Sequence, residues 1–168
     1  MTRFLFSMVL AALVLTGCKE EAGVQSDDAP ETQPPATLSS ANLAASAAFM
    51  SEMADADNVQ ATGTGLLYEV ITEGSGENPN AASIVTVHYE GALPDGTVFE
   101  SSFGGQTITF PLSRVIPGWT EGVQLMSPGA KYKFYIPPEL GYGQMGTPGG
   151  PIGPNQALVF TIELFEFE

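Results

Sequence analysis

The sequence is short of positive charge, histidine and cysteine. Of its 168 residues only 5 are Lys or Arg, against 19 Asp and Glu, so the formal net charge is −14. Nucleic-acid binding needs a basic face, and this composition argues against it. The one histidine, His88, and the one cysteine, Cys18, are too few for transition-metal sites and for Ser-His or Cys-His catalysis. We therefore expect no metal and no other cofactor.

The glycine-rich segments do not indicate a nucleotide site. None of them ends in the Lys-Ser or Lys-Thr that a P-loop requires. Gly141, Gly143 and Gly146 have the spacing of a dinucleotide-binding turn. They neither follow a strand directly nor open a helix, so this spacing predicts no such site.

The first 18 residues resemble a bacterial export signal with a lipid attachment site. Arg3 precedes an apolar run, residues 4–15, which is shorter than the about 20 residues of a membrane-spanning helix. Leu15-Thr16-Gly17-Cys18 is similar to the lipobox of bacterial lipoproteins, which implies cleavage before Cys18 and its acylation. We predict a signal peptide at residues 1–17 and a lipid anchor on Cys18. An ordinary signal peptide with an incidental cysteine is the alternative.

Two segments separate this signal from the rest of the chain. Residues 18–40, which include the lipidated Cys, are rich in Glu, Asp, Pro, Ser and Thr, lack aromatic residues, and predict a disordered acidic tether. Residues 41–64 predict a short helix and a loop. The helix is expected over Ser40–Asp57, where apolar residues recur at helical spacing and Ser39 or Ser40 can act as N-cap.

Residues 65–168 predict one β-rich domain. Its expected strands are runs of β-branched and aromatic residues, at Leu66–Ile71, Ser83–Glu90, Thr97–Glu100, Thr107–Leu112, Lys131–Ile136 and Ala157–Phe165. Alternation within the 131–136 strand directs Tyr132 and Phe134 inward and Tyr135 outward. Pro117–Met126 predicts the one helix of this domain. An antiparallel sheet of about five strands with a short helix across one face is an α+β fold.

Six aromatic residues from different segments lie near the expected turns. Buried aromatic residues belong more often to a core than to a ligand site, so composition alone indicates only a globular β-rich domain. These residues are Tyr89, Phe99, Phe110, Trp119, Tyr142 and Phe160.

The motifs around these residues resemble the FKBP-type peptidyl-prolyl isomerases over about Gly65 to Glu168. The loop at residues 148–155 looks most like the macrophage-infectivity-potentiator branch, which bacteria export. The motifs follow the order of the family and are Val87-His88-Tyr89-Glu90-Gly91, Asp95-Gly96-Thr97-Val98-Phe99-Glu100-Ser101-Ser102, Val115-Ile116-Pro117-Gly118-Trp119-Thr120-Glu121-Gly122, Gly141-Tyr142-Gly143 and Leu158-Val159-Phe160.

The resemblance implies an antiparallel sheet half-wrapped around one short α-helix, with a shallow apolar pocket between them. It implies rotation of X–Pro bonds without nucleophile, metal or cofactor, with Trp119 as the pocket floor and Tyr142 donating to the substrate carbonyl. The catalytic residues that it implies are Tyr89, Phe99, Glu100, Trp119, Tyr142 and Phe160. The substrate-binding residues that it implies are Phe110, Val115, Ile116 and Ile152.

Glu100 departs from the family, which usually has Asp at this position. The longer side chain can misplace the carboxylate by about an ångström, and we expect altered but retained activity. A binding module without turnover and a structural envelope lipoprotein remain as alternatives.

The resemblance also implies partners and a location. The expected partners are proline-containing polypeptide clients in the bacterial cell envelope, with the lipid anchor facing the periplasm. The outer membrane is favoured over the inner one because no Asp follows Cys18. We expect a monomer, since exported dimeric relatives carry a long helix where this chain has a short one. All implied pocket residues follow Gly65, so we expect the preceding helix and tether to be dispensable for catalysis.

Overall fold

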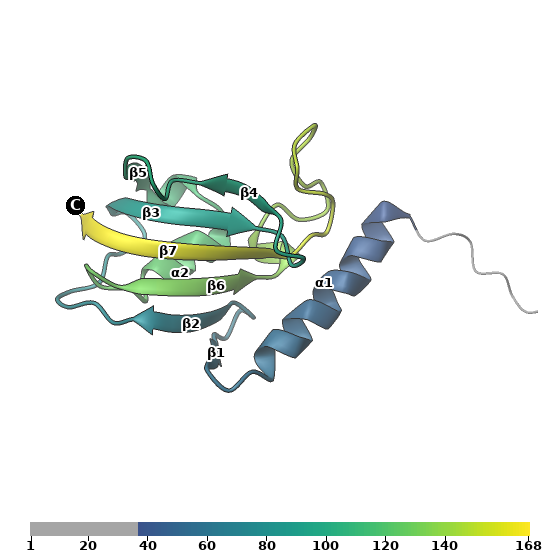
Figure 1. Cartoon of the computed structure of the whole chain (residues 1–168), viewed down its shortest axis with the longest axis horizontal. Coiled ribbons are helices and arrows are strands. Elements are labelled where there is room, and N and C mark those ends of the chain that lie inside the picture. The colour runs from purple at the N-terminus through teal and green to yellow at the C-terminus, as the bar shows by residue number, and fades with distance from the viewer. Residues whose placement is uncertain (1–36) are drawn as a thin grey trace, which may run out of the picture. The chain divides into compact units, whose positions relative to one another are not determined.

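Seven antiparallel strands form one curved sheet in the computed structural model, which describes residues 37–168 (Figure 1). The predicted signal peptide, Cys18 and the predicted tether up to residue 36 lie outside the described residues. The strand order is β1-β2-β6-β7-β3-β4, and β5 also pairs with β3. The strands are β1 (Val59–Ala61), β2 (Leu67–Thr72), β3 (Ile84–Ala92), β4 (Val98–Ser101), β5 (Ile108–Pro111), β6 (Lys131–Ile136) and β7 (Leu158–Phe167).

Strand β3 is central because three other strands pair with it. β7 pairs with it along one side, while β4 and β5 share its other side, β5 over residues 84–87 and β4 over residues 90–92. Its alternating pattern has the predicted effect, since Val85, Val87 and Tyr89 are at most 4% exposed.

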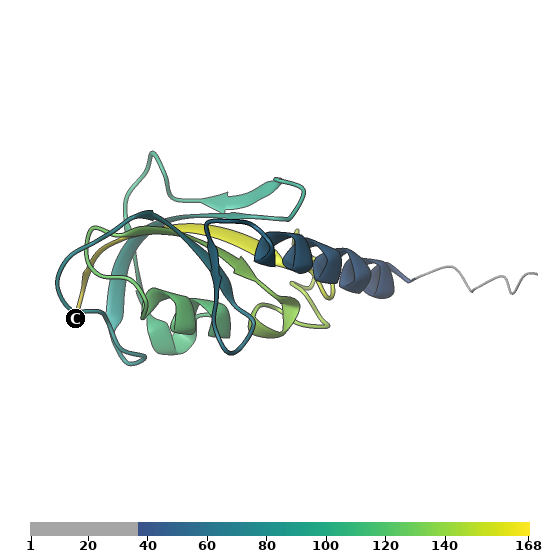
Figure 2. The ribbon, with the colours of Figure 1, turned by 90° about the horizontal axis from the view of Figure 1, so that it is seen from below.

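The short helix α2 (Pro117–Val123) lies against the concave face of the sheet, as Figure 2 shows. Two glycines permit this close approach. A Cβ on Gly118 would lie 2.7 Å from Ile136, and a Cβ on Gly122 would lie 2.7 Å from the ring of Phe134. The space between helix and sheet is the hydrophobic core, which the predicted α+β architecture requires.

Helix α1 (Leu38–Ala54) begins earlier than the sequence predicts. Its N-cap is Thr37, rather than Ser39 or Ser40, and the Thr37 hydroxyl accepts a hydrogen bond from Ser40 N. The predicted loop after the helix contains β1, which extends the sheet beyond the expected five strands. No helix within residues 37–168 is long and apolar enough to cross a membrane.

Helix α1 covers part of the outward face of β6. Tyr135 is only 6% exposed, because the ring of Phe49 from α1 packs edge-on against it with the ring centroids 6.0 Å apart. Alternation predicts the face of the strand on which Tyr135 lies, but not that another element covers this face.

Candidate active site

Helix α2 places Trp119 at the base of a pocket. Ile116 is the N-cap and Pro117 takes the first helical position, where a missing N–H removes no helical hydrogen bond. Trp119 N donates to Ile116 O at 2.9 Å in this first turn. The Trp119 side chain is 4% exposed and belongs to the core between helix and sheet.

Three aromatic rings from three strands surround the Trp119 indole. Tyr89 comes from β3, Phe110 from β5 and Phe160 from β7, and their centroids lie 5.1, 5.7 and 5.4 Å from that of the indole. The interplanar angles are 84°, 84° and 88°, so every ring meets the indole edge to face. The indole is thus a flat floor, and the three rings are walls perpendicular to it.

Tyr89 lies on β3 between the residues that pair with β5 and those that pair with β4, and Ser102 holds its backbone there. Ser102 N donates to Tyr89 O, and Ser102 Oγ accepts from Tyr89 N, both at 2.9 Å. Burial raises the pKa of Tyr89 well above its ordinary value of 10.0, and hydrogen bonding with Glu100 and the charge of this carboxylate raise it further. The Tyr89 hydroxyl is therefore neutral near pH 7.

The pocket has a volume of about 610 Å³. Its lining is mainly apolar, with a few polar groups, which is typical of small-ligand sites. The structure brings together eight residues of the predicted site in this lining, namely Tyr89, Glu100, Phe110, Val115, Ile116, Trp119, Tyr142 and Phe160.

The remaining predicted residues of the domain, Phe99 and Ile152, do not line the pocket. Phe99 packs edge-on against Phe160 with the centroids 5.7 Å apart, and it covers Gly91, where a Cβ would lie 2.6 Å from its ring. Ile152 is 4% exposed and packs within the core. Phe99 therefore supports the Phe160 wall directly, whereas Ile152 belongs to the core.

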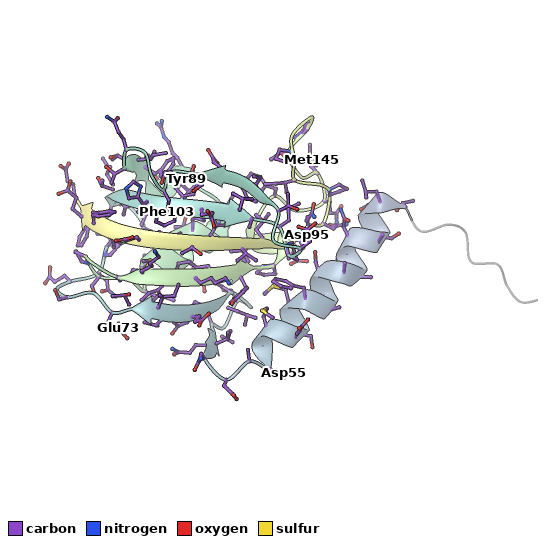
Figure 3. The ribbon with its side chains drawn as sticks, viewed as in Figure 1. Asp55, Glu73, Tyr89, Asp95, Phe103 and Met145 are labelled. Carbon is purple, nitrogen blue, oxygen red and sulfur yellow. The ribbon has the colours of Figure 1, made fainter. Side chains whose placement is uncertain are left out.

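Tyr142 places a hydroxyl at the rim of the pocket. It follows the 3-10 turn Pro138–Leu140 and is 40% exposed. Burial of its ring raises the pKa of Tyr142, and the charge of Glu100 raises it further, so the hydroxyl keeps its proton. Met145, on the loop that follows, is 77% exposed and lies away from the sheet (Figure 3).

Two lining residues, Ile108 and Arg114, were missed by the sequence analysis. Ile108 lies two residues before Phe110 in β5 and shares its face, so strand alternation could have found it. Arg114 directly precedes Val115 and is exposed at the rim. The only salt bridge within residues 37–168 joins Lys131 to Glu163, so Arg114 has no ion-pair partner in this part of the chain.

Comparisons with known proteins agree with this geometry. A family model described as FKBP-type peptidyl-prolyl cis-trans isomerase matches residues 75–165. A probable FKBP-type peptidyl-prolyl cis-trans isomerase FkpA of Neisseria meningitidis is 51% identical over 125 residues, which cover 74% of this chain and 46% of that protein. The outer membrane protein MIP of Legionella longbeachae is 44% identical over 124 residues, which cover 73% of this chain and 53% of that protein.

A crystal structure of a peptidyl-prolyl cis-trans isomerase from Pseudomonas syringae pv. tomato has the same fold. It matches with a TM-score of 0.74 and 37% identity, covering 80% of this chain and 99% of that one. By contrast, the chain spans about half the length of the curated relatives that it matches.

Proposed function

The chain belongs to the FKBP-type peptidyl-prolyl cis–trans isomerase family, and we propose that it catalyses rotation about X–Pro bonds in polypeptide clients. The predicted FKBP-like fold is confirmed by the structural match. The observation that carries the proposal is the Trp119 indole with three rings standing perpendicular to it. A flat apolar floor with three walls fits the pyrrolidine ring of a proline.

The proposed mechanism uses the apolar character of this pocket. Resonance across the X–Pro amide opposes rotation with a barrier of about 18–20 kcal/mol. The planar amide is more polarised than the twisted one, so water stabilises the planar form more than an apolar pocket does. Moving the amide from water into the pocket therefore favours the twisted transition state.

Polar groups of the rim orient the substrate in this proposal. The Tyr142 hydroxyl donates to a substrate carbonyl, because it is neutral and exposed at the pocket mouth. The hydrogen bond between Glu100 and the Tyr89 hydroxyl, which raises the pKa of Tyr89, holds the Tyr89 ring in place as a wall. Val115 and Ile116 complete the apolar contact surface, while Phe99 supports the Phe160 wall.

We further propose that the protein works as a lipid-anchored monomer in the cell envelope. The lipobox-like sequence at residues 15–18 supports the anchor on Cys18, and the residues from 18 to 36 would act as the tether. The name of one relative, outer membrane protein MIP, supports the outer membrane as the location. Mass spectrometry of the protein extracted from membranes tests the anchor, and a chain that starts elsewhere without acylation contradicts it.

The activity is tested with the full chain in detergent and a short X–Pro peptide. We expect the protein to accelerate cis–trans exchange, which takes about 10–100 s without a catalyst. Binding of the peptide without acceleration would show a binding module instead. Neither binding nor acceleration would favour a structural lipoprotein.

A further inference from the structure

The loop that carries Tyr142, residues 141–157, has little regular structure of its own. Four of its residues have positive φ, namely Gly143, Gly146, Gly149 and Asn155, and the last of these is not a glycine. Its internal hydrogen bonds include Thr147 N to Ile152 O and Asn155 N to Gly143 O, at 2.9 and 2.8 Å. A loop of this kind needs contacts with other elements to hold one conformation.

Helix α1 supplies such contacts through Ser46. The Ser46 hydroxyl donates to Asn155 O at 2.9 Å and accepts from Ala157 N at 2.8 Å. Ser46 is 3% exposed and is the only residue of α1 that is fully buried. A buried hydroxyl that satisfies two backbone groups is hard to replace, because its loss leaves both groups without a partner.

Other side chains of α1 and the loop strengthen the same contact. Asn42 Nδ2 donates to Pro154 O at 2.9 Å, and Asn155 Nδ2 donates to Ser39 Oγ at 2.8 Å. The loop backbone lies so close to the helix that a Cβ on Gly153 would be 2.8 Å from Asn42 Nδ2.

Asn155 connects this contact to the pocket. Its carbonyl accepts from Ser46, and its N–H donates to Gly143 O, one residue from Tyr142. A continuous path of two hydrogen bonds therefore runs from the middle of α1 to the residue beside the rim tyrosine. Figure 1 shows α1 beside the end of the sheet from which this loop rises, and Figure 3 shows Asp95 of the β3–β4 turn next to the same helix.

We propose that Ser46 is a positioning residue for Tyr142, and that α1 is thereby a functional part of the active site. This inference rests on the proposed isomerase function. It replaces the expectation that the helix is dispensable, and it involves an element outside the residues that the family model matches. Loss of the Ser46 hydroxyl frees the Asn155 carbonyl, loosens the link to Gly143, and lets the Tyr142 hydroxyl leave its position at the rim.

The test compares Ser46→Ala with Ser51→Ala in the full chain. Ser51 is an exposed residue of the same helix, so it controls for the loss of a helical hydroxyl. We expect Ser46→Ala to lower kcat/KM by about three- to tenfold per folded molecule, because small misplacements of a positioned group are costly. We expect Ser51→Ala to stay within about twofold of the unmodified chain. Amide exchange of Asn155 should accelerate in Ser46→Ala alone.

A double-mutant cycle with Tyr142→Phe separates positioning from general damage to the fold. If Ser46 acts through the Tyr142 hydroxyl, Ser46→Ala should cause little further loss of kcat/KM in the Tyr142→Phe background. An equal loss in both backgrounds, or no loss in Ser46→Ala, would overturn the inference. An unmodified chain without isomerase activity would instead refute the proposed function, so the two failures are distinguishable.

Discussion

Replacing Trp119 with Ala should remove the pocket floor without unfolding the protein. The indole is 4% exposed and packs against Tyr89, Phe110 and Phe160. Truncation of a buried Trp costs about 3–5 kcal/mol, and we expect the lower end because the pocket is open to water on one side. A domain with a stability of about 5–15 kcal/mol survives such a loss in most of this range. The activity per folded molecule should fall by about a hundredfold or more, since the walls no longer have a floor against which to position the proline ring.

Met126→Ala is the matched control for this prediction. Met126 is fully buried in the same core but does not line the pocket, and its truncation costs about 2–5 kcal/mol. Urea unfolding followed by circular dichroism measures both stabilities, because Trp119→Ala removes the only tryptophan and its fluorescence. An isomerisation assay at the same folded concentration then compares the activities. If folded Trp119→Ala keeps full activity, or Met126→Ala loses as much activity, the indole floor is not what catalyses rotation.

Four further predictions follow from the walls and the rim. Tyr142→Phe should reduce kcat/KM by roughly tenfold or less with unchanged stability, since a neutral hydrogen bond contributes about 0.5–1.5 kcal/mol; a loss of a thousandfold would imply another role. Phe99→Ala should leave the protein folded but lower its turnover, because the Phe160 wall loses its support and water enters the pocket. Full turnover in the folded variant would contradict this prediction. Arg114→Glu should lower kcat/KM for peptides with Glu next to Pro and raise it for peptides with Lys there, and both changes should be smaller at high salt. The same change of kcat/KM for both peptides would exclude an electrostatic effect. The folded state holds the Tyr89 proton more tightly than the unfolded chain does, so the contribution of Tyr89 to the free energy of unfolding should be steady from pH 8 to about 10 and fall above it. Urea titrations from pH 8 to 11 should show a smaller fall in Tyr89→Phe than in the unmodified chain. An equal fall in both proteins would refute this prediction.

Local patterns were sufficient for the strands, whereas the pocket aromatics were implied by the resemblance to the FKBP family. In β3, alternation alone separated the buried Val85 and Val87 from Thr86 and His88, because successive side chains of a strand point to opposite faces. The motif around Trp119 identified the helix and its first-turn proline, although α2 ends at Val123 rather than at Met126. Helix ends depend on packing beyond the local sequence, and the sequence is least informative there.

The sequence by itself determined the fold class and most of the strands, since these follow from backbone periodicity, and the resemblance of its contiguous motifs to the FKBP family implied most of the residues that line the pocket. The tertiary structure alone decided the burial of Tyr135 under Phe49, the place of Arg114 on the rim, and the contact of α1 with the loop at residues 141–157. Ser46 meets its partners 109 and 111 residues further along the chain, and nothing near it in the sequence indicates this contact. Whether a side chain is buried depends on which distant surface packs over it, and that is settled only when the whole chain has folded.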